Sequence, residues 1–431
     1  MELQQPTANQ KRLGKAKEWM KLFSVTGSVQ TIVMAVSFVS GLLVVNLLPK
    51  DQYALYTMAN TILGTMVILA DGGISNGVMA LCGKYHNDPQ KLGQVINTGM
   101  DLRKKFALGS LLIAGPILVF MLTKNGTSVA MSLLILLTII PSFFTSLSGN
   151  LLETVAKVKQ DILPLQRVKV EANLGRLVLL SLFIFVIPYA YIALLISGVP
   201  QIYSNWKVRK NANKYVDFEQ APQEEYRNSI LKVVYRILPG AAYFSISGTI
   251  NIYLISIFSK DGSTAIADLG ALDRLSMVLT IFSGLFVTLI TPRYVRLPDE
   301  RGILFNRFLQ ILVYLFGLSF FIVGFVWLFD KYLLMLLGDN FKGLEFPLLL
   351  NIIGNCIGMM AGNVYTLFTN RAWNLHPLFS IPLSAATIVV GVLLFPIGTL
   401  TGVLYLNIFI STVNLVVNSS YLIYKIHSKK R

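Results

Sequence analysis

Long apolar stretches without charge alternate with short polar segments along almost the whole chain. A helix needs about 20 mostly apolar residues to cross a bilayer. Ten runs contain no Asp, Glu, Lys or Arg, and they cover 22–49, 52–70, 106–123, 125–152, 177–206, 237–259, 275–292, 308–329, 346–370 and 372–424. The runs 177–206 and 372–424 are interrupted, at Pro188 and at PIGTLTG (396–402), so each provides two crossings. The pattern therefore predicts an all-α integral membrane protein with twelve transmembrane helices.

The composition agrees with a membrane protein. Only 13% of the 431 residues are charged and 54% are hydrophobic, whereas a soluble chain usually has about 25% charged residues. Two cysteines in apolar segments and three scattered histidines suggest neither a disulfide framework nor a metal site. The motif G-x-x-x-x-G-K-[ST] is absent from the sequence, so we expect no ATP site and no cofactor.

The net charge of +16 could suggest a nucleic-acid partner, but the positions of the charges argue against one. With the N-terminus inside the cell, thirty of the 37 Lys and Arg residues lie in inner segments and five in outer loops. This bias predicts that both termini are cytoplasmic. The basic stretch 11–21 then reads as an amphipathic cytoplasmic lead-in to the first helix.

The longest inner loop, 207–231, divides the chain. We expect an N-terminal six-helix lobe over 1–206, a cytoplasmic linker over 207–231 and a C-terminal six-helix lobe over 232–431, packed around a central cavity. Six helices is an even number, so the lobes would be parallel repeats. A weak internal match between 46–63 and 256–275 places Asn60 opposite Arg274.

Arg176 and Arg274 belong to neither the inner nor the outer segments. Counted from the expected ends of their helices at 1.5 Å per residue, each lies about 15 Å deep, near the middle of the bilayer. An arginine at that depth should face the bundle interior or a wet cavity, and its guanidinium is matched to phosphate. We therefore expect an anion site between the lobes. The alternative for Arg274 is an ion pair with Asp268, Asp273 or a neighbouring helix, and Arg176 could lie nearer the cytoplasm.

Three further charged residues are candidates for substrate or ion binding. Arg236 opens the seventh helix, where a snorkelling interface residue is the simpler account. Arg167, with Lys169, precedes the fifth helix and could form a vestibule for an anionic headgroup, although ordinary positive-inside charge explains it too. Asp71 lies before helix-breaking glycines, so it either caps or kinks the helix or couples transport to a cation.

Many polar side chains lie inside the expected helices, where hydrogen bonds between helices explain most of them. A subset could line a sugar-binding cavity. The candidates are Asn60, Tyr56, Tyr243, Asn363 and Tyr365.

Several stretches together resemble the Wzx-type polysaccharide (O-antigen and capsule) flippases of the multidrug/oligosaccharidyl-lipid/polysaccharide exporter superfamily. They are LLPKDQYALYTMANTILGTMVILADGGISNGVMAL (47–81), FSGLFVTLITPRYVRL (282–297), LMLLGDNFKGLEFPLLLNIIGNCIGMMAGNVYTLFTNRAWN (334–374) and LLFPIGTLTGVLYLN (393–407). The similarity in layout covers almost the whole chain, although each motif is loose. Ala54 stands where that family often has Gly.

The resemblance implies a flippase that is not an enzyme. It would move an undecaprenyl-pyrophosphate-linked oligosaccharide from the inner to the outer leaflet of a bacterial plasma (inner) membrane. The lobes would rock around a central site, and Arg176 and Arg274 would attract the pyrophosphate. Its partners would be the lipid-linked oligosaccharide, membrane lipid and other glycan-assembly membrane proteins.

Other function classes stay open at this point. A cation-coupled drug or metabolite antiporter of the same superfamily would favour an acidic midplane. A membrane-embedded glycan polymerase would need a sizeable outer loop with catalytic residues, and the expected outer loops contain no arginine. A channel fits less well with two lobes.

Overall fold

The computed structural model describes residues 29–259, 261–371, 373 and 375–428, and this part of the chain is helical without any strand. The basic stretch 11–21 lies outside it. In the first half the helices are Val29–Leu47, α2 (Lys50–Asp71), α3 (Ile74–Lys84), α4 (Pro89–Lys124), α5 (Val129–Val158), α6 (Ile162–Val186) and α7 (Ala190–Ala212).

The second half contains longer and more broken helices. They are α8 (Glu224–Ser247), α9 (Ile250–Phe258), α10 (Gly262–Ser276), α11 (Leu279–Leu285), α12 (Thr291–Val295), α13 (Arg301–Met335), α14 (Glu345–Thr369), α15 (Pro377–Leu394) and α16 (Leu400–His427). A π-helical turn, Phe286–Ile290, joins α11 to α12, so that 262–295 forms one long helical segment.

Nine helices of the described residues are long and apolar enough to cross a membrane, or ten if the bent pair α8 and α9 is one crossing. That pair bends by 51° at its break. The two predicted interruptions are confirmed, because α6 ends at Val186 and α7 begins at Ala190, while α15 ends at Leu394 and α16 begins at Leu400. Helices α6 and α7 fall outside the nine, so twelve crossings stay a prediction.

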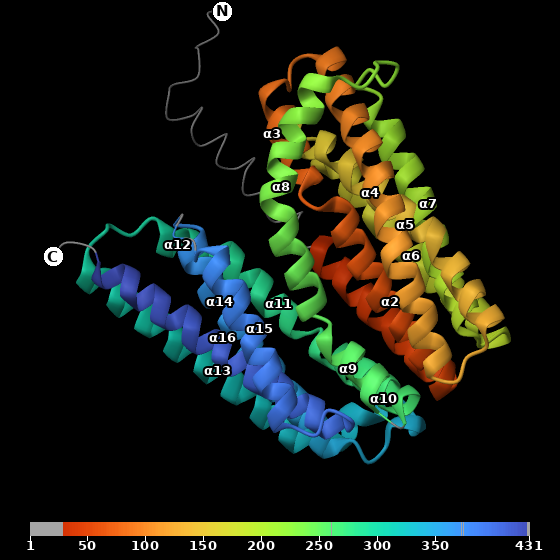
Figure 1. Ribbon diagram of the computed structural model, residues 1–431, viewed down its shortest axis with the longest axis vertical. Helices are drawn as coiled ribbons and strands as arrows, with labels where there is room; N and C mark the ends of the chain where they lie inside the picture. The colour runs from red at the N-terminus through yellow and green to blue at the C-terminus, as the bar shows by residue number, and fades with distance from the viewer. Residues whose placement is uncertain (1–28, 260, 372, 374, 429–431) are drawn as a thin grey trace, which may run out of the picture.

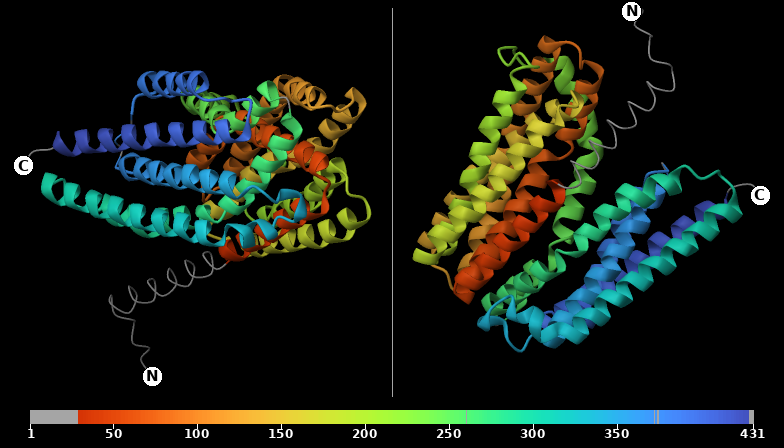
Figure 2. Two further views of the ribbon diagram at one scale, coloured as in Figure 1. Left: turned by 90° about the horizontal axis from the view of Figure 1, so that it is seen from below. Right: turned by 180° about the vertical axis from the view of Figure 1, so that it is seen from behind.

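The helices form two lobes that meet at one end and diverge at the other (Figure 1). One lobe, hereafter the N-lobe, contains α2–α7, and the C-lobe contains α9–α16; the right view of Figure 2 shows the same division from behind. At the closed end, α10 packs against α2, and α9 contacts α4. The open end lies beside the start of α8 and the C-terminal part of α16. Under the predicted topology the open end faces the cytoplasm.

Polar contacts join the lobes at the closed end. The Lys50 ammonium lies 2.6 Å from the Asp268 carboxylate. Asn46 donates to the Leu336 carbonyl at 2.8 Å, and the Asn125 amide donates to the Ser256 hydroxyl at 2.9 Å. The closed end is therefore sealed by specific bonds between the lobes as well as by apolar packing.

Helix α8 packs against the N-lobe although it follows the linker. A Cβ added at Gly72 would lie 2.8 Å from Leu238, and one added at Gly73 would lie 2.9 Å from Ile237. Both glycines have positive φ, +46° and +97°, where other residues are strained. These glycines end α2, start α3 and let α8 approach the backbone. The boundaries 1–206, 207–231 and 232–431 stay a prediction.

Candidate functional site

The two arginines that were predicted to lie near the membrane midplane, Arg176 and Arg274, come from opposite lobes and converge on one tyrosine. Arg176 on α6 donates to the Tyr56 hydroxyl at 3.4 Å. Arg274 on α10 contacts Tyr53 and interacts electrostatically with Tyr56. The Tyr53 and Tyr56 rings stack with centroids 6.1 Å apart, and each side chain is only 1% exposed. The helix α2 thus holds a phenol pair between two cationic groups.

Neither arginine has an ion-pair partner among the described residues. The expected alternative for Arg274, a pair with Asp268, is wrong because Asp268 pairs with Lys50. Asp273 precedes Arg274, and neighbouring residues on a helix point about 100° apart. Its carboxylate instead accepts a hydrogen bond from Asn351 on α14 at 3.3 Å. Arg274 therefore forms no salt bridge with either carboxylate, although Asp273 still interacts with it electrostatically.

A cavity of about 470 Å³ lies where the lobes meet, hereafter the central cavity. It is lined by Tyr53, Thr57, Asn60 and Thr61 of α2, Ile252 of α9, Gly270, Asp273, Arg274 and Ser276 of α10, Met277, Thr280, and Asn355 of α14. Asn60 and Arg274, which the internal match placed opposite each other, line it together. Residues of both lobes therefore form its wall.

A second cavity, of about 610 Å³, lies within the N-lobe and is hereafter the N-lobe cavity. Residues of α2, α5, α6 and α7 line it, with Arg176 among them. Asn60 lines this cavity as well as the central one. The two cavities are therefore neighbours on either side of Asn60.

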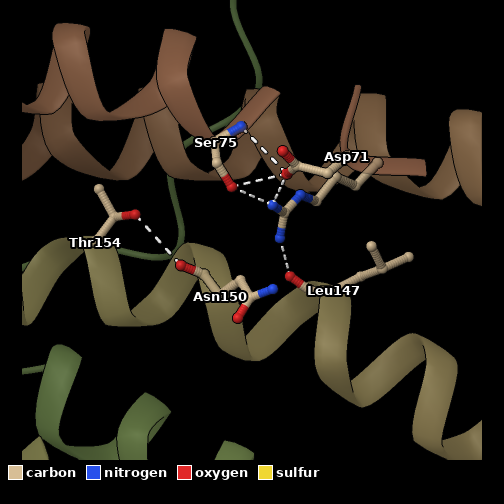
Figure 3. A network of polar contacts seen from close by, with 6 residues as sticks. Asp71, Ser75, Leu147, Asn150 and Thr154 are labelled. Carbon is tan, nitrogen blue, oxygen red and sulfur yellow. Dashed lines mark hydrogen bonds and ion pairs between the residues drawn. The ribbon is translucent and has the colours of Figure 1, made fainter. Parts of the chain in front are cut away.

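Asp71 belongs to a buried polar network at the end of α2 (Figure 3). Its carboxylate accepts from the Ser75 hydroxyl at 2.7 Å and forms an ion pair with Arg103. Arg103 is 2% exposed and also donates to the Leu147 carbonyl of α5. The network ties α2, α3, α4 and α5 together, and it explains Asp71 as a structural residue. A role of Asp71 in ion coupling stays a proposal.

Arg103 was not among the predicted site residues. It lies before the charge-free run 106–123, in a segment that the charge count assigned to an inner loop. Helix α4 begins at Pro89, however, and so carries Arg103 into the N-lobe. The carboxylate of Asp71, two helices earlier at the end of α2, is the sequence signal that could have pointed to a cationic partner.

The other predicted arginines lie away from the tyrosine pair. Arg236 is exposed on α8 and Arg167 is exposed on α6. Lys169 pairs with Glu153 at 2.9 Å. The vestibule at Arg167 and Lys169 stays a prediction.

The other predicted sugar-lining residues are also scattered. Tyr365 is 45% exposed and lines a C-lobe cavity of about 440 Å³ with residues of α8, α14, α15 and α16. Asn363 lines a small apolar cavity of about 220 Å³. The hydroxyl of Tyr243 is buried without a hydrogen-bond partner among the described residues. Of the five candidates, only Tyr56 and Asn60 lie beside the arginines.

Comparison with solved structures gives the fold. A multidrug resistance MATE family transporter of the MOP superfamily, in an inward-facing conformation, matches with TM-score 0.72, covering 92% of this chain and 96% of that chain. The chain has the MATE fold. The sequence identity is 13%, so the likeness shows the fold alone.

Other transporters with the MATE fold match as well. A MOP superfamily transporter from Pyrococcus furiosus, described as having a binding pocket of reverse polarity, matches with TM-score 0.63 at 14% identity over 92% of this chain and 94% of that one. An outward-facing MATE family transporter matches with TM-score 0.61 at 15% identity over 93% of each chain. No protein-family model and no curated protein matches the sequence. The neighbours with this fold include transporters in inward- and outward-facing conformations.

Proposed function

We propose that this protein is a flippase for an undecaprenyl-pyrophosphate-linked oligosaccharide in a bacterial inner membrane. The observation that carries the proposal is the pair Arg176 and Arg274, one from each lobe, beside Tyr56. Neither arginine forms a salt bridge among the described residues, although the Asp273 carboxylate acts on Arg274 electrostatically. Guanidinium groups bind phosphate oxygens through paired hydrogen bonds. A pyrophosphate could bridge both arginines, while its lipid tail remains in the bilayer.

The arrangement of the lobes supports uptake from the inner leaflet. Under the predicted topology the open end faces the cytoplasm, where lipid-linked oligosaccharides are made. The similarity to an inward-facing MATE transporter is higher than to an outward-facing one, with TM-scores of 0.72 and 0.61. Rocking of the lobes would move the two arginines relative to each other and carry the site to the other leaflet.

The remaining predicted residues take secondary places in this proposal. Arg167 and Arg236, both exposed, would attract anionic headgroups on the way to the site. Asp71 would be the candidate for ion coupling. Other glycan-assembly membrane proteins would supply and consume the substrate, and the proposal contains no catalytic step.

The test is transport by purified protein in vesicles that contain the lipid-linked oligosaccharide. We expect Arg274→Ala to reduce flipping at least tenfold, since a charged hydrogen bond contributes about 1.5–3 kcal/mol. Arg274→Lys should recover part of the activity, because lysine restores the positive charge but lacks the paired N–H donors of a guanidinium group. Arg307→Ala is the matched control, because Arg307 is exposed on α13 and its one side-chain hydrogen bond to the described residues goes to Gln310. Full flipping by Arg274→Ala would contradict the proposal.

The second candidate function is a cation-coupled antiporter, and Asp273 favours it. Its carboxylate is exposed in the central cavity, where a cationic substrate or coupling ion could bind. The two functions make opposite predictions. An antiporter should lose drug transport in Asp273→Asn and keep it in Arg274→Ala, whereas the flippase should be more sensitive to Arg274→Ala.

A further inference from the structure

We propose that the N-lobe cavity binds the saccharide part of the substrate while the arginines bind its pyrophosphate. This inference rests on the proposed function. It assigns the saccharide to a wall of amide and hydroxyl side chains that the sequence did not single out as a group. The ligand class is a neutral, hydroxyl-rich sugar unit attached to an anionic group.

The lining of the N-lobe cavity suits such a ligand. The lining includes Ser146 and Asn150 of α5, Asn173 of α6, and Gln201, Ser204 and Asn205 of α7. Amides and hydroxyls both donate and accept, as sugar hydroxyls do. Two charged residues at one end neutralise each other, because Glu153 lies 2.9 Å from Lys169. Arg176 is the remaining cation of the lining.

The charges and amides follow an order along the helices. Arg176 is seven residues beyond Lys169 on α6, which separates them by about 10 Å. Glu153 and Asn205 lie toward the ends of α5 and α7 that face the open end. The cavity therefore runs from Arg176 and Asn60, beside the central cavity, through the amides to the paired charges. A sugar chain linked to a pyrophosphate at Arg176 would extend along this wall.

Part of the wall is already ordered by its own hydrogen bonds. The Ser146 hydroxyl donates to the Gln201 side-chain oxygen at 3.0 Å. The Asn205 amide nitrogen donates to the Ser148 hydroxyl. The Asn205 side-chain oxygen is buried and accepts no bond from the described residues. A buried acceptor without a partner costs free energy that a hydroxyl donor from a ligand would recover.

The C-lobe cavity beside Tyr365 provides the contrast. It is also lined by amides and hydroxyls, including Asn414, Asn418 and Ser384. Its lining includes no charged residue among those described, and it shares no residue with the central cavity. Both cavities are thus lined by amide side chains, but of the two only the N-lobe cavity has an arginine in its lining.

The experiment compares two probes with the purified full-length protein. One is lipid-linked oligosaccharide isolated from cells depleted of this protein, and the other is undecaprenyl pyrophosphate without sugar. Asn205→Leu and Gln201→Met keep side-chain size and remove hydrogen bonding. Asn414→Leu is the matched control in the C-lobe cavity. Dissociation constants are measured by titration in detergent.

We expect Asn205→Leu and Gln201→Met each to weaken binding of the sugar-bearing lipid about tenfold and to leave the bare lipid unchanged. Asn414→Leu should change neither affinity, and Arg176→Ala should weaken both. If Asn205→Leu does not fold, Gln201→Met decides the outcome.

Two results would overturn the saccharide site while leaving the flippase in place. One is equal affinity of the unsubstituted protein for both lipids. The other is loss of sugar-dependent affinity in Asn414→Leu but not in Gln201→Met. If the unsubstituted protein binds neither lipid, the proposed function and the saccharide site fall together.

Discussion

The ion pair between Lys50 and Asp268 should control how often the closed end opens. Lys50 starts α2 in the N-lobe and Asp268 lies in α10 of the C-lobe, with nitrogen and oxygen 2.6 Å apart. Any movement that separates the lobes at this end must break this pair. We therefore expect Lys50→Met to shift the protein toward a conformation in which the lobes separate at the end where they now meet.

The size of the shift follows from burial. The Asp268 side chain is 10% exposed and that of Lys50 is 30% exposed. Exposed pairs contribute about 0–1 kcal/mol, whereas loss of one partner of a buried pair costs about 3–5 kcal/mol. For this half-buried pair we expect about 2 kcal/mol, which is about a thirtyfold change in the ratio of closed to open forms. Asp268→Asn should shift the ratio less, since Lys50 can turn toward water.

The assay measures access to the central cavity from the outside. Met277→Cys places a thiol in that cavity, in a background with Cys82 and Cys356 replaced by serine. A membrane-impermeant maleimide added to intact cells should label this thiol about thirtyfold faster in Lys50→Met than with Lys50 present. The charge-swapped double variant, Lys50→Asp with Asp268→Lys, should return most of the way to the original rate.

The control is an ion pair at the same end that is fully exposed. Lys342 and Asp339 lie 2.7 Å apart with side chains 72% and 90% exposed, both on one loop. Lys342→Met should leave labelling unchanged. Equal labelling rates in Lys50→Met and Lys342→Met would refute the reasoning. So would a charge-swapped double variant that is labelled as fast as Lys50→Met.

Two further predictions concern stability. Arg103→Met should destabilise the purified protein by about 3–5 kcal/mol, measured as a lower melting temperature, because it leaves the largely buried Asp71 carboxylate without its cation. Adding Asp71→Asn should recover part of the lost stability. If the double variant melts no higher than Arg103→Met, the ion pair is not the cause of the loss. Gly93→Ala should loosen the linker from α4, because the added Cβ would lie 1.8 Å from the Asp217 carbonyl oxygen. Limited proteolysis should then cut the linker faster. Gly83→Ala is the control and should leave the cleavage rate unchanged, because a Cβ added at Gly83 has no neighbour within 4 Å.

The hydrophobic pattern predicts the helices well because the bilayer imposes a length and an apolar surface on each of them. The interruptions at Pro188 and 396–402 follow from local chemistry in the same way. The pattern underestimates how far helices extend beyond the membrane. The helix α4 begins at Pro89 although the charge-free run begins at 106, so charge-free length alone misplaced Arg103.

The site was predictable in part, and for a physical reason. Depth along a helix can be counted from the sequence, so Arg176 and Arg274 could be placed at one level. Which groups they face depends on how the lobes pack, and the sequence does not encode that locally. The contact between Tyr53 and Tyr56 follows from their three-residue spacing on one helix. The ion pair between Lys50 and Asp268 joins segments far apart in the sequence and required the tertiary structure.

The packing of α8 has a consequence for how the chain is made. The first seven helices leave the ribosome before α8 does, and until then Gly72, Gly73 and Gly77 have no helix to cover them. Added Cβ atoms at these three positions would lie only 2.8–3.2 Å from α8, so the groove fits that helix closely. The N-lobe is thus completed by a segment synthesised after the linker. We expect biosynthesis to join the two halves in sequence, with α8 as the step that closes the first half and begins the second.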